Sequence, residues 1–171
     1  PYDDKLITPF VDALIKEIGF YSDKNRNAVI SSVYFGGGTP TVIGSELKRI
    51  TDALRNNFNI KDDFAIETNP NDITDETISL LRKCGFESIS IGVQSFNNSM
   101  LECIGRKYDS ETARKSLGKI LESGFKSVNM DLLFALPGQT EEELQEDLKT
   151  AAAHEPDQIT CYPLFSFPYS E

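Results

Sequence analysis

The sequence contains no tryptophan, a single histidine and only three cysteines in 171 residues. Cys84, Cys103 and Cys161 are far apart, and no CxxC pair is present. Their odd number and wide spacing argue against a disulfide framework and a self-contained zinc site, and they fit a reducing compartment. We expect Cys84 and Cys103 to be packing residues in helices. We expect His154 to be a solvated helix-end residue rather than a metal or haem ligand.

Basic residues and long apolar runs are also scarce. Lys and Arg total 17 against 27 Asp and Glu, so the formal net charge is −10. This balance argues against a general nucleic-acid surface and an anionic membrane face. No apolar stretch reaches the roughly 20 residues of a transmembrane helix, and the N-terminus shows no signal-peptide pattern. We therefore expect a cytoplasmic protein without nucleic-acid binding or membrane insertion.

Apolar and β-branched runs alternate with segments of helical period. A first helix is predicted at about residues 4–20, and residues 45–58 place their apolar side chains on one helical stripe. Such alternation predicts an α/β fold with parallel strands joined by right-handed crossovers. We expect one domain over residues 1–171, and a missing first strand before Pro1. The five predicted strands are at about residues 28–35, 63–67, 87–93, 126–132 and 157–162.

Glycine followed by phenylalanine recurs at three places that we interpret as helix ends. Gly19, Gly85 and Gly124 are each expected to be the left-handed residue just past a helix, with the next Phe completing the stop. The segment from Thr140 to Glu143 predicts a capping box at the start of another helix.

Chemically distinctive residues are predicted at the carboxyl ends of the strands, where α/β proteins collect their ligands. The first strand is followed by Gly36–Pro40, the second ends on Glu67, the third on Gln94, and Asp131 lies near the end of the fourth. Together they could hold a ligand that carries an amine, hydroxyls and a carboxylate. In the structural alternatives, the glycines form only a sharp turn, Glu67 and Asp131 cap helices, and Gln94 binds loop backbone. GGGTPT matches neither GxGxxG nor a P-loop.

Six motifs in order carry a resemblance over nearly the whole chain. They are YFGGGTPT (34–41), ExNP (67–70), IGVQSFN (91–97), IGRKY (104–108), NMDLLFALPGQT (129–140) and QITCYPL (158–164). The chain resembles the radical S-adenosylmethionine (SAM) superfamily, in its oxygen-independent coproporphyrinogen III oxidase-like branch, which includes haem-utilisation relatives. The resemblance implies an incomplete (β/α)6 barrel.

The resemblance also implies a SAM site. Bare backbone at the glycine turn would let the methionine end of SAM approach, and the polar side chains would complete the site. We expect each of these side chains at or just beyond a strand end. No catalytic residue or metal ligand is assigned. The implied SAM contacts are Gly37, Gly38, Thr39, Glu67, Gln94, Arg106 and Asp131.

The cofactors implied are SAM and a [4Fe–4S] cluster held by a CxxxCxxC loop. No such loop is present, and the three cysteines are spaced wrongly to replace it. We expect the loop before Pro1, so that the chain is a fragment of the radical SAM core and inactive by itself.

The implied activity is that of a radical SAM oxidoreductase acting on a porphyrinogen or haem-related substrate with an external electron donor. Oxidative decarboxylation is the standard reaction of the family. A haem-binding or haem-trafficking protein on the same scaffold is the alternative, and an unrelated α/β module for a nucleotide-like ligand is a third interpretation. Tyr108, where many relatives have histidine, and Ala135, where glycine is common, suggest a side branch.

Overall fold

The computed structural model describes residues 3–165. The chain divides into two compact units. The N-terminal unit comprises the residues up to Glu67 together with Thr74–Ser88, and the C-terminal unit comprises Thr68–Ile73 together with the residues from Ile89 onward. The predicted single domain over residues 1–171 includes ends outside the described residues and stays a prediction.

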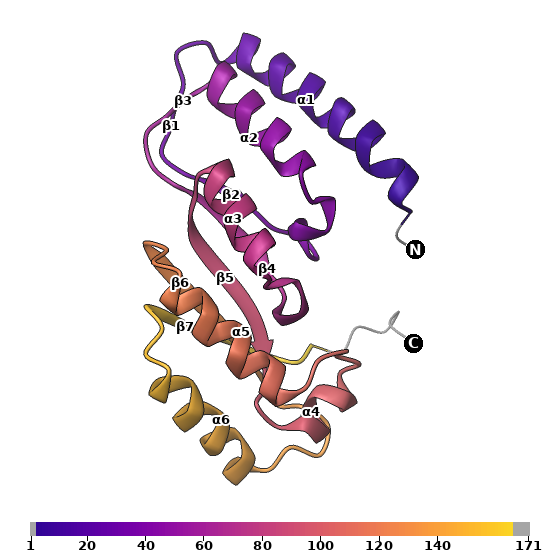
Figure 1. Cartoon of the computed structure of the whole chain (residues 1–171), viewed down its shortest axis with the longest axis vertical. Helices are drawn as coiled ribbons and strands as arrows, with labels where there is room; N and C mark the ends of the chain where they lie inside the picture. Colours follow the sequence, from indigo (N-terminus) through magenta and orange to yellow (C-terminus); the bar gives the residue numbers. More distant parts are fainter. Residues whose placement is uncertain (1–2, 166–171) are drawn as a thin grey trace. The chain divides into compact units, whose positions relative to one another are not determined.

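The N-terminal unit is built around two long helices that lie side by side (Figure 1). Val11, Ile18 and Ile50 form its buried cluster, and the half-buried Phe35 packs against them. This confirms the helical stripe predicted for residues 45–58. The elements are the short helix η1 (Asp4–Leu6), α1 (Ile7–Lys24), β1 (Val29–Ile30), β2 (Val33–Phe35), the short helix η2 (Pro40–Ile43), α2 (Glu46–Asn57), β3 (Asn59–Ile60), β4 (Phe64–Thr68) and α3 (Asp75–Cys84).

The predicted helix end at Gly19 is wrong, because α1 continues to Lys24. A glycine inside a helix costs only about 1 kcal/mol relative to alanine, and the burial of Ile18 offsets that cost. The other two predicted stops are confirmed. Gly85 and Gly124 have φ angles of +78° and +68°, in the left-handed region.

The predicted strand at residues 28–35 is two strands. Val29–Ile30 pairs in parallel with β3, a short strand that the sequence pattern did not indicate, and Val33–Phe35 pairs in parallel with β4. Ser31 and Ser32, both exposed, separate the two segments.

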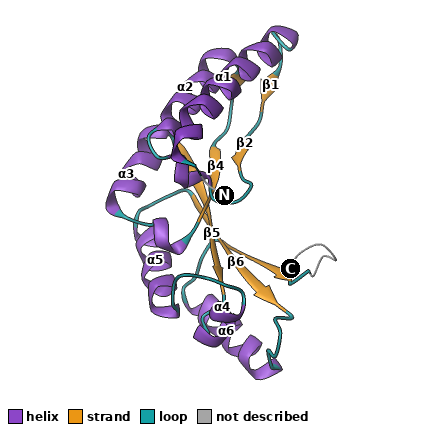
Figure 2. Cartoon of the chain, turned by 90° about the vertical axis from the view of Figure 1, so that its right-hand side faces the viewer, coloured by secondary structure: helices purple, strands orange, loops and turns teal. Residues whose placement is uncertain are grey.

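Within residues 3–165, the C-terminal unit carries three α-helices, one short helix and the last strands (Figure 2). Thr140 and Glu143 form the predicted capping box at the start of the last helix. No helix within residues 3–165 combines the length and apolar character needed to cross a membrane. The elements are the short helix η3 (Pro70–Asp72), β5 (Phe86–Gln94), α4 (Asn98–Cys103), α5 (Ser110–Glu122), β6 (Ser127–Phe134), α6 (Glu141–Ala153) and β7 (Gln158–Pro163).

Five strands form one sheet in the order β2-β4-β5-β6-β7. The β6–β7 pair is parallel and in register from Asn129 opposite Gln158 to Phe134 opposite Pro163. Strand β5 belongs to both units, with its residues up to Ser88 in the first and those from Ile89 in the second. The α/β alternation with parallel strands is thereby confirmed.

Strand β6 has one apolar and one polar face. Val128, Met130 and Leu132 are almost fully buried, and the alternating Asn129 and Asp131 are half-buried. Successive side chains of a strand point to opposite faces, so the polar residues share one face of β6.

Candidate functional site

The three glycines after β2 form a turn in the N-terminal unit. Gly37 and Gly38 have φ angles of +89° and +86°, which residues with side chains rarely adopt. The glycines are exposed, and the half-buried Thr39 precedes η2 without a side-chain hydrogen bond to that helix. The turn therefore presents bare backbone and one hydroxyl at the surface of this unit.

Glu67 lies against the glycine turn and is held there by two donors. The backbone N–H of Gly37 donates to Glu67 Oε2 at 3.0 Å, and the Tyr34 hydroxyl donates to Glu67 Oε1 at 3.0 Å. These bonds tie β2 and β4 together beyond their backbone pairing, and neither is a helix cap. The structure thus brings together two of the predicted site residues, Gly37 and Glu67.

Gly36, the first glycine of the run, is needed for a different reason. A Cβ atom added to Gly36 would lie 2.9 Å from both Glu67 Oε1 and Tyr34 Cε1, whereas one added to Gly37 or Gly38 would meet no atom within 4 Å. Gly36 therefore leaves room for Glu67, and the other two glycines supply the positive φ angles. Sequence reasoning did not assign Gly36 a role, because its place in the run was the only signal.

Gln94 ends β5 in the C-terminal unit with a φ angle of +69°, which is uncommon for a residue with a side chain. The residue is only 9% exposed, and its amide, whose atoms are not fully buried, has no hydrogen-bond partner within residues 3–165. The predicted alternative, in which Gln94 binds loop backbone, is therefore wrong. A Cβ atom on Gly92 would lie 2.7 Å from Gln94 Nε2, so Gly92 provides the space that this amide occupies. Since the amide is unpaired and still reaches the surface, it can bond a ligand there, which makes Gln94 a candidate ligand contact.

Asp131 lies within β6 rather than near its end, because the strand continues to Phe134 alongside β7. Its carboxylate accepts hydrogen bonds from Ser90 Oγ at 3.0 Å and from Asn129 Nδ2 at 2.7 Å. Thr160 on β7 extends the network by donating to Asn129 Oδ1 at 2.8 Å. Asp131 is thus one member of a polar network that links β5, β6 and β7.

Arg106 lies in the loop between α4 and α5, so its predicted place just beyond a strand end is wrong. Helix α4 intervenes after β5, and the Arg106 backbone N–H bonds to the Leu101 carbonyl at 2.9 Å. The Arg106 side chain is exposed.

Tyr108, two residues after Arg106, is buried, and its hydroxyl donates to the carbonyl oxygens of Gly92 at 2.8 Å and Val93 at 3.1 Å. Burial raises the pKa of Tyr108 to about 12, and the nearby Arg106 partly counteracts this. Tyr108 therefore holds the end of β5 immediately before Gln94.

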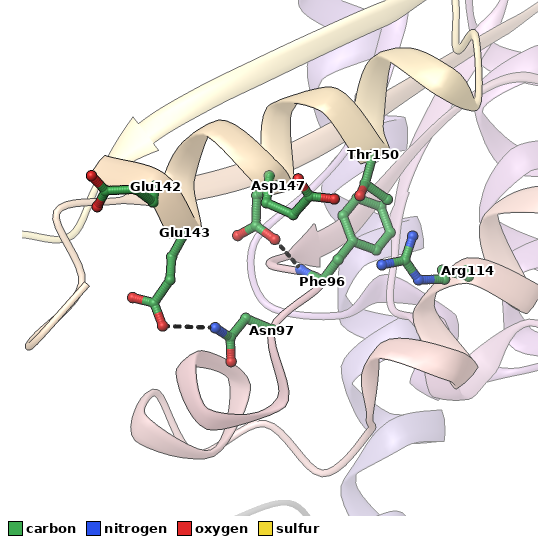
Figure 3. A pocket seen from close by; sticks show the side chains of 8 residues that line it. Phe96, Asn97, Arg114, Glu142, Glu143, Asp147 and Thr150 are labelled. Carbon is green, nitrogen blue, oxygen red and sulfur yellow. Dashed lines mark hydrogen bonds between the residues drawn. The ribbon is translucent and has the colours of Figure 1, made fainter. Parts of the chain in front are cut away.

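A cavity of about 350 Å³ opens on the C-terminal unit beside the loop that follows Gln94 (Figure 3). Asp147, 3% exposed, accepts hydrogen bonds from Ser95 Oγ at 2.6 Å and from the Phe96 backbone N–H at 2.7 Å. Burial raises the pKa of Asp147, and these two hydrogen bonds oppose the shift. Arg114 lies over the Phe96 ring, 4.7 Å from its centroid. Sequence reasoning missed this arrangement, because nothing in the pattern of a helix predicts which distant loop a buried acid binds.

His154 caps the C-terminal end of α6, as predicted, but it is not solvated as predicted. Its ring stacks on Phe96 with the centroids 5.8 Å apart, and it is half-buried. Burial, with a smaller contribution from Arg114, lowers the pKa of His154.

The cysteines do not fit a [4Fe–4S] cluster. Cys84 is fully buried, as expected of a packing residue, while Cys161 and Cys103 are exposed, and for Cys103 the packing prediction is therefore wrong. Within residues 3–165, no three His, Cys, Asp and Glu side chains gather to hold a metal ion.

The predicted SAM contacts belong to different units. Gly37, Gly38, Thr39 and Glu67 lie in the first, whereas Gln94, Arg106 and Asp131 lie in the second. Their convergence on one ligand stays a prediction.

Comparison with known proteins identifies related chains. A model described as the radical SAM superfamily matches residues 9–151. The heme chaperone HemW of Lactococcus lactis is 35% identical over 147 residues, which cover 84% of this chain and 38% of that protein. The oxygen-independent coproporphyrinogen III oxidase of Escherichia coli is 33% identical over 162 residues, which cover 93% of this chain and 35% of that protein. The chain thus spans little more than a third of the length of these relatives.

Solved structures agree on the fold. Coproporphyrinogen III oxidase (HemN) from Escherichia coli, described as a radical SAM enzyme, matches with a TM-score of 0.90 and 31% identity, over 98% of this chain and 39% of that one. The archaeal Elp3 of Methanocaldococcus infernus matches with a TM-score of 0.74 at 20% identity, over 92% of this chain and 43% of that one. The predicted incomplete barrel of the radical SAM fold is thereby confirmed.

Proposed function

The chain belongs to the radical SAM superfamily, and from this premise we propose that it is the SAM-binding core of an oxidoreductase acting on a porphyrinogen or haem-related substrate. The observation that carries the proposal is the bond between Gly37 and Glu67, because it holds a carboxylate beside exposed, side-chain-free backbone. Such a turn suits the approach of an amino acid group, which carries both an ammonium donor and a carboxylate acceptor.

In this proposal, the residues of the N-terminal unit bind the methionine end of SAM. Gly37 and Gly38 expose backbone, and Thr39 offers a hydroxyl that forms no bond to η2. Each oxygen of Glu67 accepts one hydrogen bond within the unit, so a second lone pair on each can accept from the SAM ammonium group.

The residues of the C-terminal unit bind the remaining polar groups of SAM. Gln94 supplies an amide that lacks another partner within residues 3–165. Arg106 supplies an exposed guanidinium for a charge-assisted bond to the SAM carboxylate. Asp131 supplies a carboxylate already oriented by Ser90 and Asn129.

The second cofactor that the family implies is a [4Fe–4S] cluster, which would supply an electron when bound. Residues 3–165 contain no ligand set for it, so we assign only SAM binding and orientation to this chain. The hard chemistry in such proteins belongs to the bound cofactors, while the protein binds and orients.

The proposed reaction is oxidative decarboxylation of a porphyrinogen, with an external electron donor as the partner and the cytoplasm as the location. The related protein named oxygen-independent coproporphyrinogen III oxidase supports it. The second candidate is haem binding or trafficking on the same scaffold, which the related proteins named heme chaperone support at 35% and 31% identity.

A paired binding experiment tests SAM binding. The complete protein, with its cluster reconstituted anaerobically, is titrated with SAM in its wild-type form and as Glu67→Ala and Glu17→Ala. Glu17 is an exposed acidic residue of α1. Its replacement by alanine removes the same charge as Glu67→Ala, but away from the glycine turn, and therefore serves as the control. We expect Glu67→Ala to weaken SAM binding about five- to a hundredfold and Glu17→Ala to leave it unchanged. Equal affinities for all three proteins would contradict the proposed site.

A second experiment separates the two candidate roles. The same protein is assayed for anaerobic porphyrinogen decarboxylation and is titrated separately with haem. Turnover with SAM consumption supports the oxidoreductase, whereas stoichiometric haem binding without turnover supports the haem-trafficking alternative.

A further inference from the structure

The backbone of Gln94 has an uncommon conformation, which is closed locally by the bond from the Ser95 N–H to the Val93 carbonyl at 2.9 Å and restrained further by other parts of the C-terminal unit. A residue with a Cβ atom is strained at a φ angle of +69°. The surrounding contacts must therefore favour this conformation over the extended one that would continue β5. The residues before and after Gln94 show which groups make those contacts.

Asp147 of α6 fixes the two residues that follow Gln94. Its Oδ2 accepts from the hydroxyl of Ser95, and its Oδ1 accepts from the backbone N–H of Phe96. Ser95 is fully buried and Asp147 is 3% exposed. A buried carboxylate with both oxygens bonded to one short segment leaves that segment little freedom, because releasing it would leave an unpaired buried charge.

Two further contacts restrain the same segment. Tyr108 donates to the carbonyl oxygens of Gly92 and Val93, on the strand side of Gln94. Glu143, one turn before Asp147 on α6, accepts from Asn97 Nδ2 at 3.0 Å (Figure 3). Glu143 also completes the capping box of α6 by accepting from the Thr140 backbone N–H at 2.9 Å.

We propose that Asp147 is a positioning residue for SAM binding: it holds Ser95 and Phe96 so that Gln94 keeps its left-handed backbone and presents its amide to the ligand. This proposal rests on the proposed function, because it takes Gln94 as a SAM contact. Asp147 acts through Gln94 and does not itself touch SAM. It links helix α6, which follows the LPGQT motif, to the QSFN motif at the end of β5.

The test compares three changes at Asp147 in the complete, cluster-loaded protein. Asp147→Ala and Asp147→Leu remove both acceptors, and the leucine, which is somewhat larger than aspartate, fills the space that alanine leaves empty. Asp147→Asn keeps an acceptor for Phe96, and its amide can donate to Ser95 Oγ. We expect the alanine and leucine variants to bind SAM at least fivefold more weakly, and the asparagine variant to stay within about threefold of wild type.

A matched control separates positioning from a general loss of stability. Ala151 is fully buried on α6 and makes no side-chain hydrogen bond, so Ala151→Gly destabilises the same helix without changing the loop contacts. We expect Ala151→Gly to lower the melting temperature while leaving the SAM affinity unchanged. If Asp147→Ala and Asp147→Leu also lower the melting temperature while leaving the SAM affinity unchanged, as expected for Ala151→Gly, the positioning role is overturned.

A double-mutant cycle tests whether Asp147 acts through Gln94. Gln94→Ala removes the amide, so adding Asp147→Ala to it should weaken SAM binding by less than twofold more. Additive losses would overturn the proposal. Hydrogen exchange at the Phe96 amide gives a readout independent of activity, and we expect it to accelerate in Asp147→Ala but not in Ala151→Gly.

The outcomes also distinguish this proposal from the proposed function. If the wild-type protein binds SAM and Glu67→Ala weakens that binding, the SAM site stands even where Asp147→Ala behaves like the control, and only the positioning role fails. If the wild-type protein does not bind SAM, both proposals fail.

Discussion

The backbone N–H of Gly37 donates to Glu67 Oε2 at 3.0 Å, across 30 residues of sequence. The bond joins the turn after β2 to a side chain near the end of β4, and it forms only because Gly36 leaves space beside Glu67. The glycine run and the acidic residue of the ExNP motif belong to separate parts of the sequence. In the structure they form one local arrangement. This arrangement explains why the first glycine of the run is needed even though it need not adopt a positive φ angle.

Replacing Gly36 with alanine should disrupt the contact between Gly37 and Glu67. The added Cβ atom would lie 2.9 Å from Glu67 Oε1, so the carboxylate must move and the bond to the Gly37 backbone is lost. We expect the free energy of unfolding to fall by about 1–2 kcal/mol, measured by urea denaturation. In Gly36→Ala/Glu67→Ala the clash with the carboxylate is absent and only the contact with the Tyr34 ring remains, so the double variant should lose less than the sum of the two single losses.

Gly19→Ala is the matched control for that experiment. Gly19 lies inside α1, and a Cβ atom there would meet no atom within 4 Å. This change should stabilise the protein by about 0.5–1 kcal/mol. A similar gain from Gly36→Ala would contradict the packing explanation for Gly36.

Ala135→Gly should stabilise the protein. Ala135 follows β6 at a φ angle of +57°, a left-handed conformation that costs a residue with a Cβ atom roughly 1–2 kcal/mol. Glycine relieves that strain but loses more backbone entropy on folding, so we expect a net gain of about 0.5–1 kcal/mol in urea denaturation. Ala151→Gly, within α6, should instead lose about 1 kcal/mol. A loss of stability from both changes would contradict the strain at Ala135.

The regular elements were largely predictable from the sequence, because each depends on local pattern. The stripe of α2, the capping box at Thr140 and the stops at Gly85 and Gly124 all follow from residues within one or two helical turns. The predicted helix end at Gly19 was wrong, because the burial of the neighbouring Ile18 outweighed the weak helix propensity of one glycine.

The side-chain arrangement of the site was less predictable, because it depends on contacts between distant residues. The motif residues Glu67 and Gln94 could be singled out from their places at strand ends. The groups that orient them could not, since Tyr34 and Asp147 reach their partners only through tertiary packing. Asp131 was displaced from its predicted strand end because pairing with β7 extends β6 past it.

Changes at Asp131 and Asn129 should separate ligand binding from sheet stability. Both residues belong to the network with Ser90, but only Asp131 is a predicted SAM contact. Asp131→Ala and Asn129→Ala should each lower the free energy of unfolding by about 1–3 kcal/mol. We expect only Asp131→Ala to weaken SAM binding by an additional factor of five or more, measured by anaerobic calorimetric titration of the complete protein. If both variants lose affinity equally, the role of Asp131 is to stabilise the network and it is not a SAM contact.

Tyr108 should make stability fall at high pH. An ordinary tyrosine has a pKa near 10, whereas burial raises the pKa of Tyr108 in the folded protein to about 12. Because the folded state holds the proton more tightly, the contribution of Tyr108 to stability is fully present below pH 10. It is lost as the pH rises from 10 to 12, since only the unfolded state can release the proton easily. We expect this loss to be about 1–2 kcal/mol after allowing for solvent screening.

Comparison with Tyr108→Phe isolates that loss from other groups that titrate at high pH. At pH 7 the variant should be less stable than wild type, because the hydrogen bonds from the Tyr108 hydroxyl to the carbonyls of Gly92 and Val93 are lost. Between pH 10 and 12 the difference should shrink, because phenylalanine has no proton to lose. Tyr162→Phe, at a side chain that is 48% exposed, is the matched control and should keep the wild-type pH dependence. A constant difference between wild type and Tyr108→Phe across this range would contradict the raised pKa and the role of burial at Tyr108.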